Sequence, residues 1–233
     1  MNREYDRRLI KFEKVDKMRF IGHLDLLRIF QGAIRRANLP IAYSSGFNPH
    51  QKMAFALPLP LGMQSTCEYL ELFFEKNIPF NLFDLNDFLP SGLRILECYE
   101  ISQKTPNPSG AVKAAEYNVI FDGMQNSAPY LQEILDSSQI IVLKKTKKST
   151  KETDIRPDIF MLKYIETSLY MRISAGSSRN LNPMILANYI LAKMGLTIFE
   201  HEISITRGNL FTTATTSEYS VDNSLLLWQI KDF

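Results

Sequence analysis

The sequence contains few of the residues that build metal and disulfide sites. Its 233 residues include only two cysteines, Cys67 and Cys98, and three histidines. An iron–sulfur cluster or a four-thiolate zinc site needs more cysteines at close spacing. Two cysteines are also too few for the disulfide framework of a small secreted domain. We therefore expect a cytoplasmic chain that holds no metal ion and no cofactor.

Long apolar runs and a strong net charge are absent as well. No apolar run approaches the roughly 18 residues of a transmembrane helix, and residues 1–8 alternate charges instead of forming a signal-peptide core. We expect no association with a membrane. Hydrophobic residues make up 45% of the chain, which is typical of a folded globular protein and not of a disordered one. Because the formal net charge is only +2, nucleic-acid binding would require a local basic patch.

The first half of the chain has the pattern of a compact α+β unit. Apolar residues at helical spacing, including Leu24, Phe30 and Ile34, predict a helix that begins at Gly22 and ends at Asn38, before Pro40. A second helix is expected at residues 80–89. Strands are expected at residues 9–20, 41–57 (one bulged strand or two), 67–75 and 93–101. The order β-α-β-β-α-β is that of a ferredoxin-like fold.

The same order returns after a segment rich in proline and serine. Strands are expected at 116–121, 169–174 and 197–206, helices at 129–135 and 183–194, and apolar segments at 140–144 and 158–164 on either side of a basic insertion. We therefore expect an α+β protein with two tandem ferredoxin-like halves and antiparallel sheets. Its parts would be an N-terminal domain (1–103), a linker (104–115) and a C-terminal domain with the insertion (116–233).

Residues 19–62 hold the densest set of candidate functional side chains. Gly22 and His23 would lie at the N-terminus of the first helix, where free N–H groups suit a phosphate or a carboxylate. If residues 41–44 belong to the second strand, the loop that carries Gly46 and His50 would emerge at the same end. The two histidines could then face one pocket, with Arg19 and Lys52 nearby. His23 could equally be a buried histidine bonded to backbone, and a metal site of His23, His50 and Asp25 lacks a diagnostic spacing.

Several motifs resemble those of the radical-SAM-linked protein family. They are GHLDL at 22–26, a run from Arg35 to Lys52 that includes GFNPH at 46–50, ALPLPLG at 56–62, EYL at 68–70, a lysine-rich block before Asp-Ile-Arg-Pro at 144–157, and Ile-Thr-Arg-Gly at 205–208. That bacterial family has no known function. Its members stand alone or are fused to B12-binding radical SAM proteins. The resemblance implies a B12-binding radical SAM protein as partner, and an accessory module rather than the catalyst, because this chain lacks the cysteine triplet. The expected fold is also similar to that of CRISPR repeat-processing endoribonucleases, an analogy that does not fix function.

Basic residues form two candidate patches for RNA. Arg28, Arg35 and Arg36 fall on the outer side of the first helix, where they could follow a phosphate backbone or simply face water. Lys144, Lys145, Lys147 and Lys148 could form a hairpin that grips nucleic acid, or a solvated loop. Phe47 could stack on a base or belong to the core. Arg156 could brace a loop and Arg207 could follow a strand in a turn, although either could hold a phosphate.

Three functions remain open from the sequence. The first is a non-catalytic module that binds RNA and presents it to a radical SAM enzyme. The second is a metal-independent endoribonuclease with His23 or His50 as general acid–base, and the third is a protein-interaction module that binds no RNA. The candidate contacts to a ligand or phosphate are Gly22, His23, Arg28, Arg35, Arg36, Gly46, Phe47, Asn48, His50, Lys52, Lys144, Lys145, Lys147, Lys148, Arg156 and Arg207.

Overall fold

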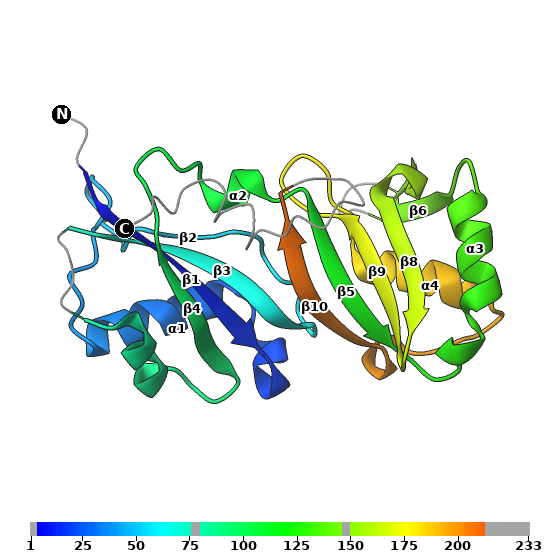
Figure 1. The fold of residues 1–233 in the computed structure, drawn as a ribbon, viewed down its shortest axis with the longest axis horizontal. Helices are drawn as coiled ribbons and strands as arrows, with labels where there is room; N and C mark the ends of the chain where they lie inside the picture. The colour runs from blue at the N-terminus through cyan, green and yellow to red at the C-terminus, as the bar shows by residue number, and fades with distance from the viewer. Residues whose placement is uncertain (1–3, 76–79, 146–149, 213–233) are drawn as a thin grey trace.

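The chain folds as a mixed α+β protein around one mostly antiparallel sheet of eight strands. The computed structural model describes residues 4–75, 80–145 and 150–212, and it includes no side-chain description of Lys145. The strand order is β4-β1-β3-β10-β5-β9-β8, and β2 pairs with β3 beside this path. Figure 1 shows an elongated molecule with the two halves of the chain side by side. The predicted α+β class is confirmed.

The N-terminal half supplies one side of the sheet. Its elements are β1 (Asp6–Lys14), a 3-10 helix η1 (Asp16–Phe20), α1 (His23–Arg36), β2 (Met53–Phe55), β3 (Gln64–Phe74), a 3-10 helix η2 (Leu82–Phe88) and β4 (Leu93–Glu100). β1 lies between β3 and β4 and pairs with both in antiparallel register. The first strand ends at Lys14 and not at the predicted Phe20, because the chain turns at Asp16, whose φ is +54°.

The C-terminal half supplies the other side. Its elements are α2 (Pro108–Ala111), β5 (Ala114–Ile120), η3 (Met124–Asn126), α3 (Ala128–Asp136), β6 (Ile141–Lys145), β7 (Thr150–Asp154), η4 (Arg156–Asp158), β8 (Ile159–Ile165), β9 (Ser168–Ser174), α4 (Pro183–Lys193), η5 (Glu200–Glu202) and β10 (Ser204–Phe211). The predicted cap of α4 is confirmed, since the Asn182 side chain accepts a hydrogen bond from the Met184 N–H at 3.0 Å. The last strand was predicted at 197–206 but begins at Ser204, after the η5 turn.

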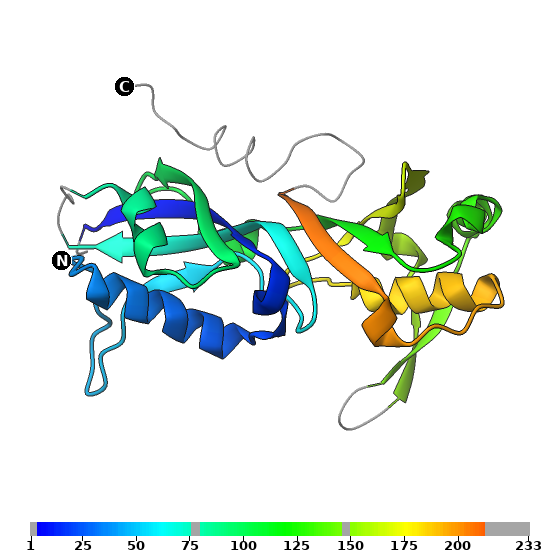
Figure 2. The same ribbon diagram turned by 90° about the horizontal axis from the view of Figure 1, so that it is seen from below.

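Helix α1 covers one face of the N-terminal half of the sheet (Figure 2). Leu26, Phe30 and Ile34 recur at intervals of four, so they lie on one side of the helix and are buried against β1 and β3. Leu24, which the sequence pattern placed on this side, is 65% exposed. At 14 residues α1 is the longest helix in the described ranges, and no helix there is long and apolar enough to cross a membrane.

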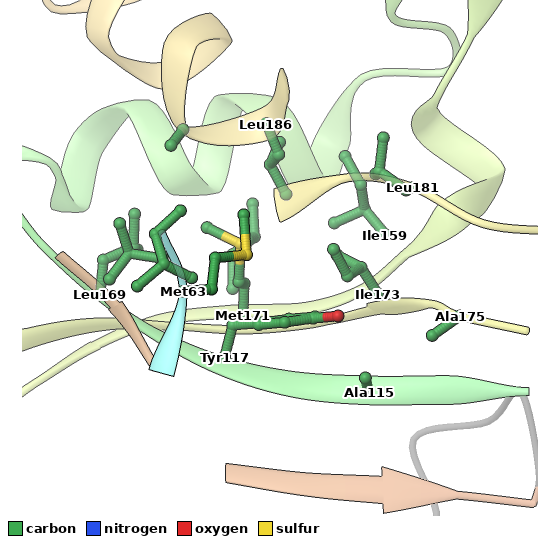
Figure 3. Packing of buried hydrophobic residues seen from close by; sticks show 14 of the residues in the cluster. Met63, Ala115, Tyr117, Ile159, Leu169, Met171, Ile173, Ala175, Leu181 and Leu186 are labelled. Atoms are coloured by element: carbon green, nitrogen blue, oxygen red, sulfur yellow. The ribbon is translucent and has the colours of Figure 1, made fainter. Parts of the chain in front are cut away.

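A second core fills the C-terminal half. Buried side chains from β5, β8 and β9 pack beneath α3 and α4, and Figure 3 shows Tyr117, Met171 and Ile173 among them. Residues from the N-terminal half, including Met63 and Cys67, join the same cluster. The two halves therefore share apolar packing and are not connected by the linker alone.

The sheets of the two halves are joined through β10. Thr206 and Arg207 pair in parallel with Gln64 and Ser65 of β3, while the rest of β10 pairs antiparallel with β5. The expected antiparallel pairing does not hold at this junction, where β10 and β3 run parallel. The short β2 pairs only with residues 70–72 of β3, so the beginning of β3 at Gln64 and Ser65 is free to accept another strand.

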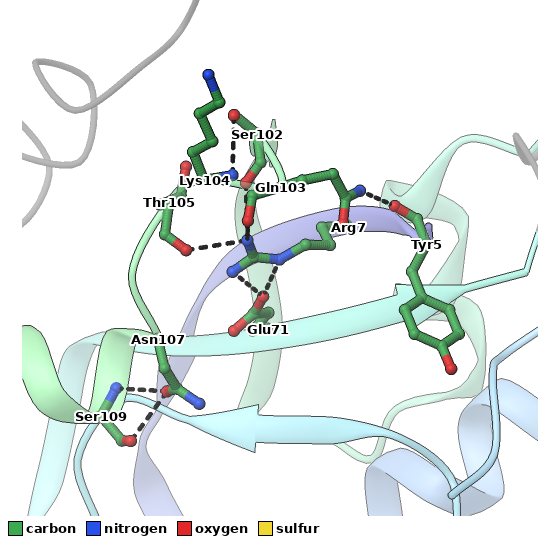
Figure 4. A network of polar contacts seen from close by, with 9 residues as sticks. All are labelled: Tyr5, Arg7, Glu71, Ser102, Gln103, Lys104, Thr105, Asn107 and Ser109. Carbon is green, nitrogen blue, oxygen red and sulfur yellow. Dashed lines mark hydrogen bonds and ion pairs between the residues drawn. The ribbon is translucent and has the colours of Figure 1, made fainter. Parts of the chain in front are cut away.

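The predicted linker packs closely on the N-terminal half. The guanidinium of Arg7 donates hydrogen bonds to the carbonyls of Ser102, Gln103 and Thr105 at 2.7–3.1 Å and pairs with the Glu71 carboxylate at 2.6 Å (Figure 4). Arg7 and Glu71 are buried. Burial raises the pKa of Glu71 although the nearby Arg7 charge opposes the shift. Residues 102–105 are therefore held in place by Arg7, and we call them the strap. They lead into α2, whose Pro108 and Ala111 are also buried.

Candidate functional site

Three arginines of α1 line an open groove. Arg28, Arg35 and Arg36, with Gly32 between them, face the end of η2 around Phe88 across a hollow of about 800 Å³. Spacings of seven and eight residues from Arg28 bring these side chains to one side of the helix. Gly32 has no side chain, and the guanidinium of Arg36 lies over this position, 3.2 Å from where a Cβ atom would be. This is the basic outer face that the sequence predicted.

The three guanidinium groups differ in their partners. Arg28 pairs with the exposed Asp25 at 2.7 Å, and Arg36 donates a hydrogen bond to the Phe88 carbonyl at 2.5 Å. Arg35 is exposed and makes no ion pair or side-chain hydrogen bond within the described ranges. Pairs as exposed as Arg28–Asp25 are weak in water, so these cations remain available to an anion.

The loop that contains Gly46 and His50 projects beside the C-terminal end of α1 (Figure 2). The Ser44 hydroxyl lies 2.9 Å from Nδ1 of His50 and accepts the His50 N–H at 3.1 Å, so the loop is closed at its base. Gly46 has a φ of +119°, a conformation that side chains disfavour, as its position in a turn predicted. Phe47 is fully exposed at the tip, which excludes the alternative that it belongs to the core. Asn48 is exposed beside it.

A smaller pocket of about 180 Å³ lies between this loop and the last turns of α1. It is lined by Gln31, Arg35, Tyr43, Pro49, His50 and Gln51. Arg35 lines both this pocket and the open groove, so the two hollows are adjacent. We call the two together the α1 site.

His23 does not belong to the α1 site. It is the first residue of α1, is exposed, and lies edge-on to the Phe55 ring at 5.1 Å. His50 lies beside Arg35, in the last turn of α1. At a rise of 1.5 Å per residue, Arg35 is about 18 Å from His23 along the helix axis. The expected pocket shared by both histidines is therefore wrong. Ile41 pairs with Phe74 and Tyr43 with Gln51 before β2 begins, so the loop interrupts the start of the strand and does not follow its end.

Lys52 is also separated from His50. Its ammonium lies 4.0 Å from the centroid of the Tyr5 ring, in a cation–π contact. Neighbouring residues of an extended chain point to opposite faces, so Lys52 faces away from the pocket that Gln51 lines. Gly22 caps α1 with an ordinary φ of −73° and has open space around it, so no close contact requires glycine there.

The predicted lysine hairpin is formed by β6 and β7, which pair only with each other. Lys144 is opposite Lys151 in the hairpin, and its ammonium donates to the Asn180 carbonyl at 3.3 Å. Lys147 and Lys148 lie outside the described residues. Figure 2 shows the hairpin on the same side of the sheet as the loop that ends at His50.

Arg156 and Arg207 are committed to the fold. The Arg156 guanidinium donates to the carbonyls of Ser137, Ile159 and Leu135 at 2.6–3.1 Å, which matches the predicted bracing role. Arg207 lies inside β10 and is 0% exposed. A phosphate cannot reach it in this structure. The burial of Arg207 was not predicted, because the strand was expected to end at Thr206.

One family model matches the chain, over residues 7–183. It describes an uncharacterized protein family conserved in bacteria (DUF2344). The chain belongs to this family. The matched region contains the whole α1 site and the β6–β7 hairpin but ends before β10. No curated protein matches the chain.

Sequence reasoning missed a buried charged cluster where the two halves meet. Arg207 of β10 forms a two-point ion pair with Glu68 of β3, with N–O distances of 2.8 and 2.5 Å, and also donates to the carbonyls of Leu57 and Pro58. Burial alone lowers the pKa of Arg207, but the Glu68 and Tyr117 oxygens raise it above its usual value. The guanidinium therefore stays charged. The sequence signal for this cluster was Glu68 in the apolar run CEYLELFFE at residues 67–75, because a carboxylate buried in a strand requires a charged partner.

Lys14 of β1 belongs to the same cluster. It is 1% exposed, and its ammonium nitrogen has no hydrogen-bond partner among the described residues. Burial lowers the pKa of Lys14, while Glu68 raises it and Arg207 lowers it further. Among the described residues, no group of three or more His, Cys, Asp or Glu side chains is placed to hold a metal ion.

Proposed function

We propose that this chain is a cytosolic, non-catalytic module that binds RNA and presents it to a separate radical SAM enzyme. The observation that carries the RNA part is the convergence of Arg28, Arg35 and Arg36 on one groove. Phosphate contacts dominate the affinity of proteins for nucleic acid, and arginine suits them because of its several donors. The exposed Phe47, at the tip of the loop that ends at His50, supplies a surface on which a base can stack.

The radical SAM partner rests on the sequence resemblance alone. A separate catalyst is consistent with the two cysteines of this chain, neither of which is suited to bind a metal cluster. Cys67 is buried, and burial raises the pKa of Cys98 to about 11, so neither is prepared as a thiolate ligand. The nuclease alternative would have to use a single histidine, because His23 and His50 lie at opposite ends of α1 and cannot share one acid–base reaction.

We also propose that each half is a ferredoxin-like unit, within boundaries at 1–103 and 116–233. The strand orders support this. The first half has β4-β1-β3-β2 and the second has β10-β5-β9-β8, so each places its fourth strand beside its first and its second beside its third. The 3-10 helix η2 occupies the position of the second helix in the first half.

The test compares RNA binding by the wild type with two variants of equal charge. One variant changes Arg28, Arg35 and Arg36 to Gln, and the control changes the exposed Lys104, Lys113 and Lys163 to Gln. Fluorescence anisotropy with a 12-nucleotide RNA is measured between 50 and 300 mM salt. A single-stranded site loses about 0.7 from the slope of log affinity against log salt for each lost phosphate contact. We expect the arginine variant to lose about 2 from this slope and the lysine control to lose little.

Two outcomes would count against the proposal. Absence of salt-dependent RNA binding by the wild type would favour the protein-interaction alternative. Equal losses in both variants would show that only bulk charge matters, and that the α1 site is not the RNA site.

A further inference from the structure

We propose that the small pocket of the α1 site, between α1 and the loop that ends at His50, takes one unpaired base that has an amino donor beside a ring-nitrogen acceptor on its Watson–Crick edge, adenine or cytosine. This inference rests on the proposed RNA binding and adds which part of the RNA is recognised. The pocket is smaller than the roughly 300–1,000 Å³ of sites for drug-sized ligands. It therefore suits a single flat group rather than a whole nucleotide.

The polar end of the pocket has an acceptor without a donor. Gln51 is 6% exposed, and its Oε1 atom has no hydrogen-bond partner in the described part of the chain. Its amide nitrogen reaches only the Gln31 carbonyl, at 3.4 Å. A buried amide with an unmet acceptor is costly, and folded proteins rarely retain one without a ligand or water. Because this oxygen is buried, the amide must turn toward the pocket before an incoming N–H group can satisfy it.

His50 offers the complementary group. Its Nδ1 is held by the Ser44 hydroxyl, so only Nε2 is left to contact a ligand. When the hydroxyl donates its proton to Nδ1, the neutral imidazole carries hydrogen on Nε2 and presents a donor. The pocket then combines an acceptor at Gln51 with a donor at His50. Adenine and cytosine carry an amino donor next to a ring-nitrogen acceptor, which matches this pair.

The remaining walls suit the face of a base and its phosphate. Tyr43 is 45% exposed and can stack on a planar ring, with Pro49 supplying apolar surface. Arg35 reaches both the pocket and the arginine groove, so a base in the pocket would have its phosphate beside that side chain. A flexible single strand meets these demands together, whereas a base pair hides its amino group.

The experiment uses the full chain and three eight-nucleotide RNAs, rA8, rC8 and rU8, at one salt concentration. We expect the wild type to bind rA8 and rC8 about threefold to tenfold more tightly than rU8, the range of one neutral hydrogen bond. Gln51→Leu should remove this preference, and Tyr43→Ala should weaken binding to all three RNAs. Lys163→Gln is the surface control. Thermal melting checks that each variant folds, and the exposed Tyr43 provides the test if Gln51→Leu does not.

The outcomes separate this inference from the proposed function. If rA8, rC8 and rU8 bind with equal affinity, or if Gln51→Leu keeps the wild-type preference, the base pocket is refuted while RNA binding stands. If Tyr43→Ala binds all three RNAs as tightly as the wild type does, stacking in this pocket is refuted as well. If no RNA binds in a salt-dependent way, the proposed function fails and this inference fails with it.

Discussion

Breaking the ion pair between Glu68 and Arg207 should be among the most destabilising single changes in this chain. Arg207 is 0% exposed, and its charged partner is the carboxylate of Glu68. Changing Glu68 to Leu leaves a guanidinium in the core with only the carbonyls of Leu57 and Pro58 and the Tyr117 hydroxyl. Removing one member of a buried pair costs about 3–5 kcal/mol. Since whole domains have about 5–15 kcal/mol of unfolding free energy, this is about a fifth of the total or more.

Urea denaturation followed by far-UV circular dichroism measures the effect. We expect the midpoint of Glu68→Leu to fall by an amount equal to the lost free energy divided by the m-value. The double variant Glu68→Leu with Arg207→Met removes both members of the pair and should recover much of the loss, because the guanidinium is no longer left in the core without its counter-ion. The exposed pair Asp25–Arg28 is the control and should contribute less than about 1 kcal/mol. A loss below 1 kcal/mol for Glu68→Leu, or a double variant no more stable than the single one, would refute this reasoning.

Three further predictions concern buried groups away from the α1 site. Lys14→Met should raise the free energy of unfolding by about 1–3 kcal/mol at pH 7, because an unsatisfied buried amine is removed. The folded state lowers the pKa of Lys14, so between the folded pKa and 10.5 the unfolded state binds more protons than the folded state. The unfolding free energy of the wild type therefore rises as the pH rises toward 10.5, and the difference in unfolding free energy between Lys14→Met and the wild type should shrink. A difference that stays the same at every pH would contradict this prediction. Iodoacetamide at pH 8 should leave Cys67 and Cys98 unmodified in the folded chain and label both in urea, as read by mass spectrometry. Arg7→Met should free the strap and speed tryptic cleavage after Lys104 severalfold, whereas Arg8→Met, which keeps the strap contacts, should not.

Local sequence patterns predicted the helices and strands better than they predicted which elements lie next to one another in space. The helix α1 and the cap of α4 follow from apolar spacing and from Asn182 before Pro183, which are short-range signals. The basic face of α1 was predicted for the same reason. The position of His50 could not be predicted in this way, because it depends on the pairing of Ile41 with Phe74 of β3, 33 positions further along the chain.

The charged cluster between the halves was missed for a related reason. Glu68 and Arg207 are separated by 139 residues, and only the register of β10 against β3 and β5 brings them together. A single sequence holds no pattern that predicts such a pairing. The bounds of β10 were also misjudged, since Gly208 suggested a turn but lies beside a register shift within the strand.

The pairing of β10 with β3 has a consequence for synthesis on the ribosome. Gln64 and Ser65 emerge early, but their partners Thr206 and Arg207 emerge about 140 residues later. Until then the Glu68 carboxylate lacks its counter-ion, and one end of β3 remains an open edge. A nascent chain released before residue 207 would therefore carry an unpaired charge and an unprotected strand, two features that promote aggregation and degradation. Formation of β10 thus supplies both the counter-ion of Glu68 and the partner for the open edge of β3.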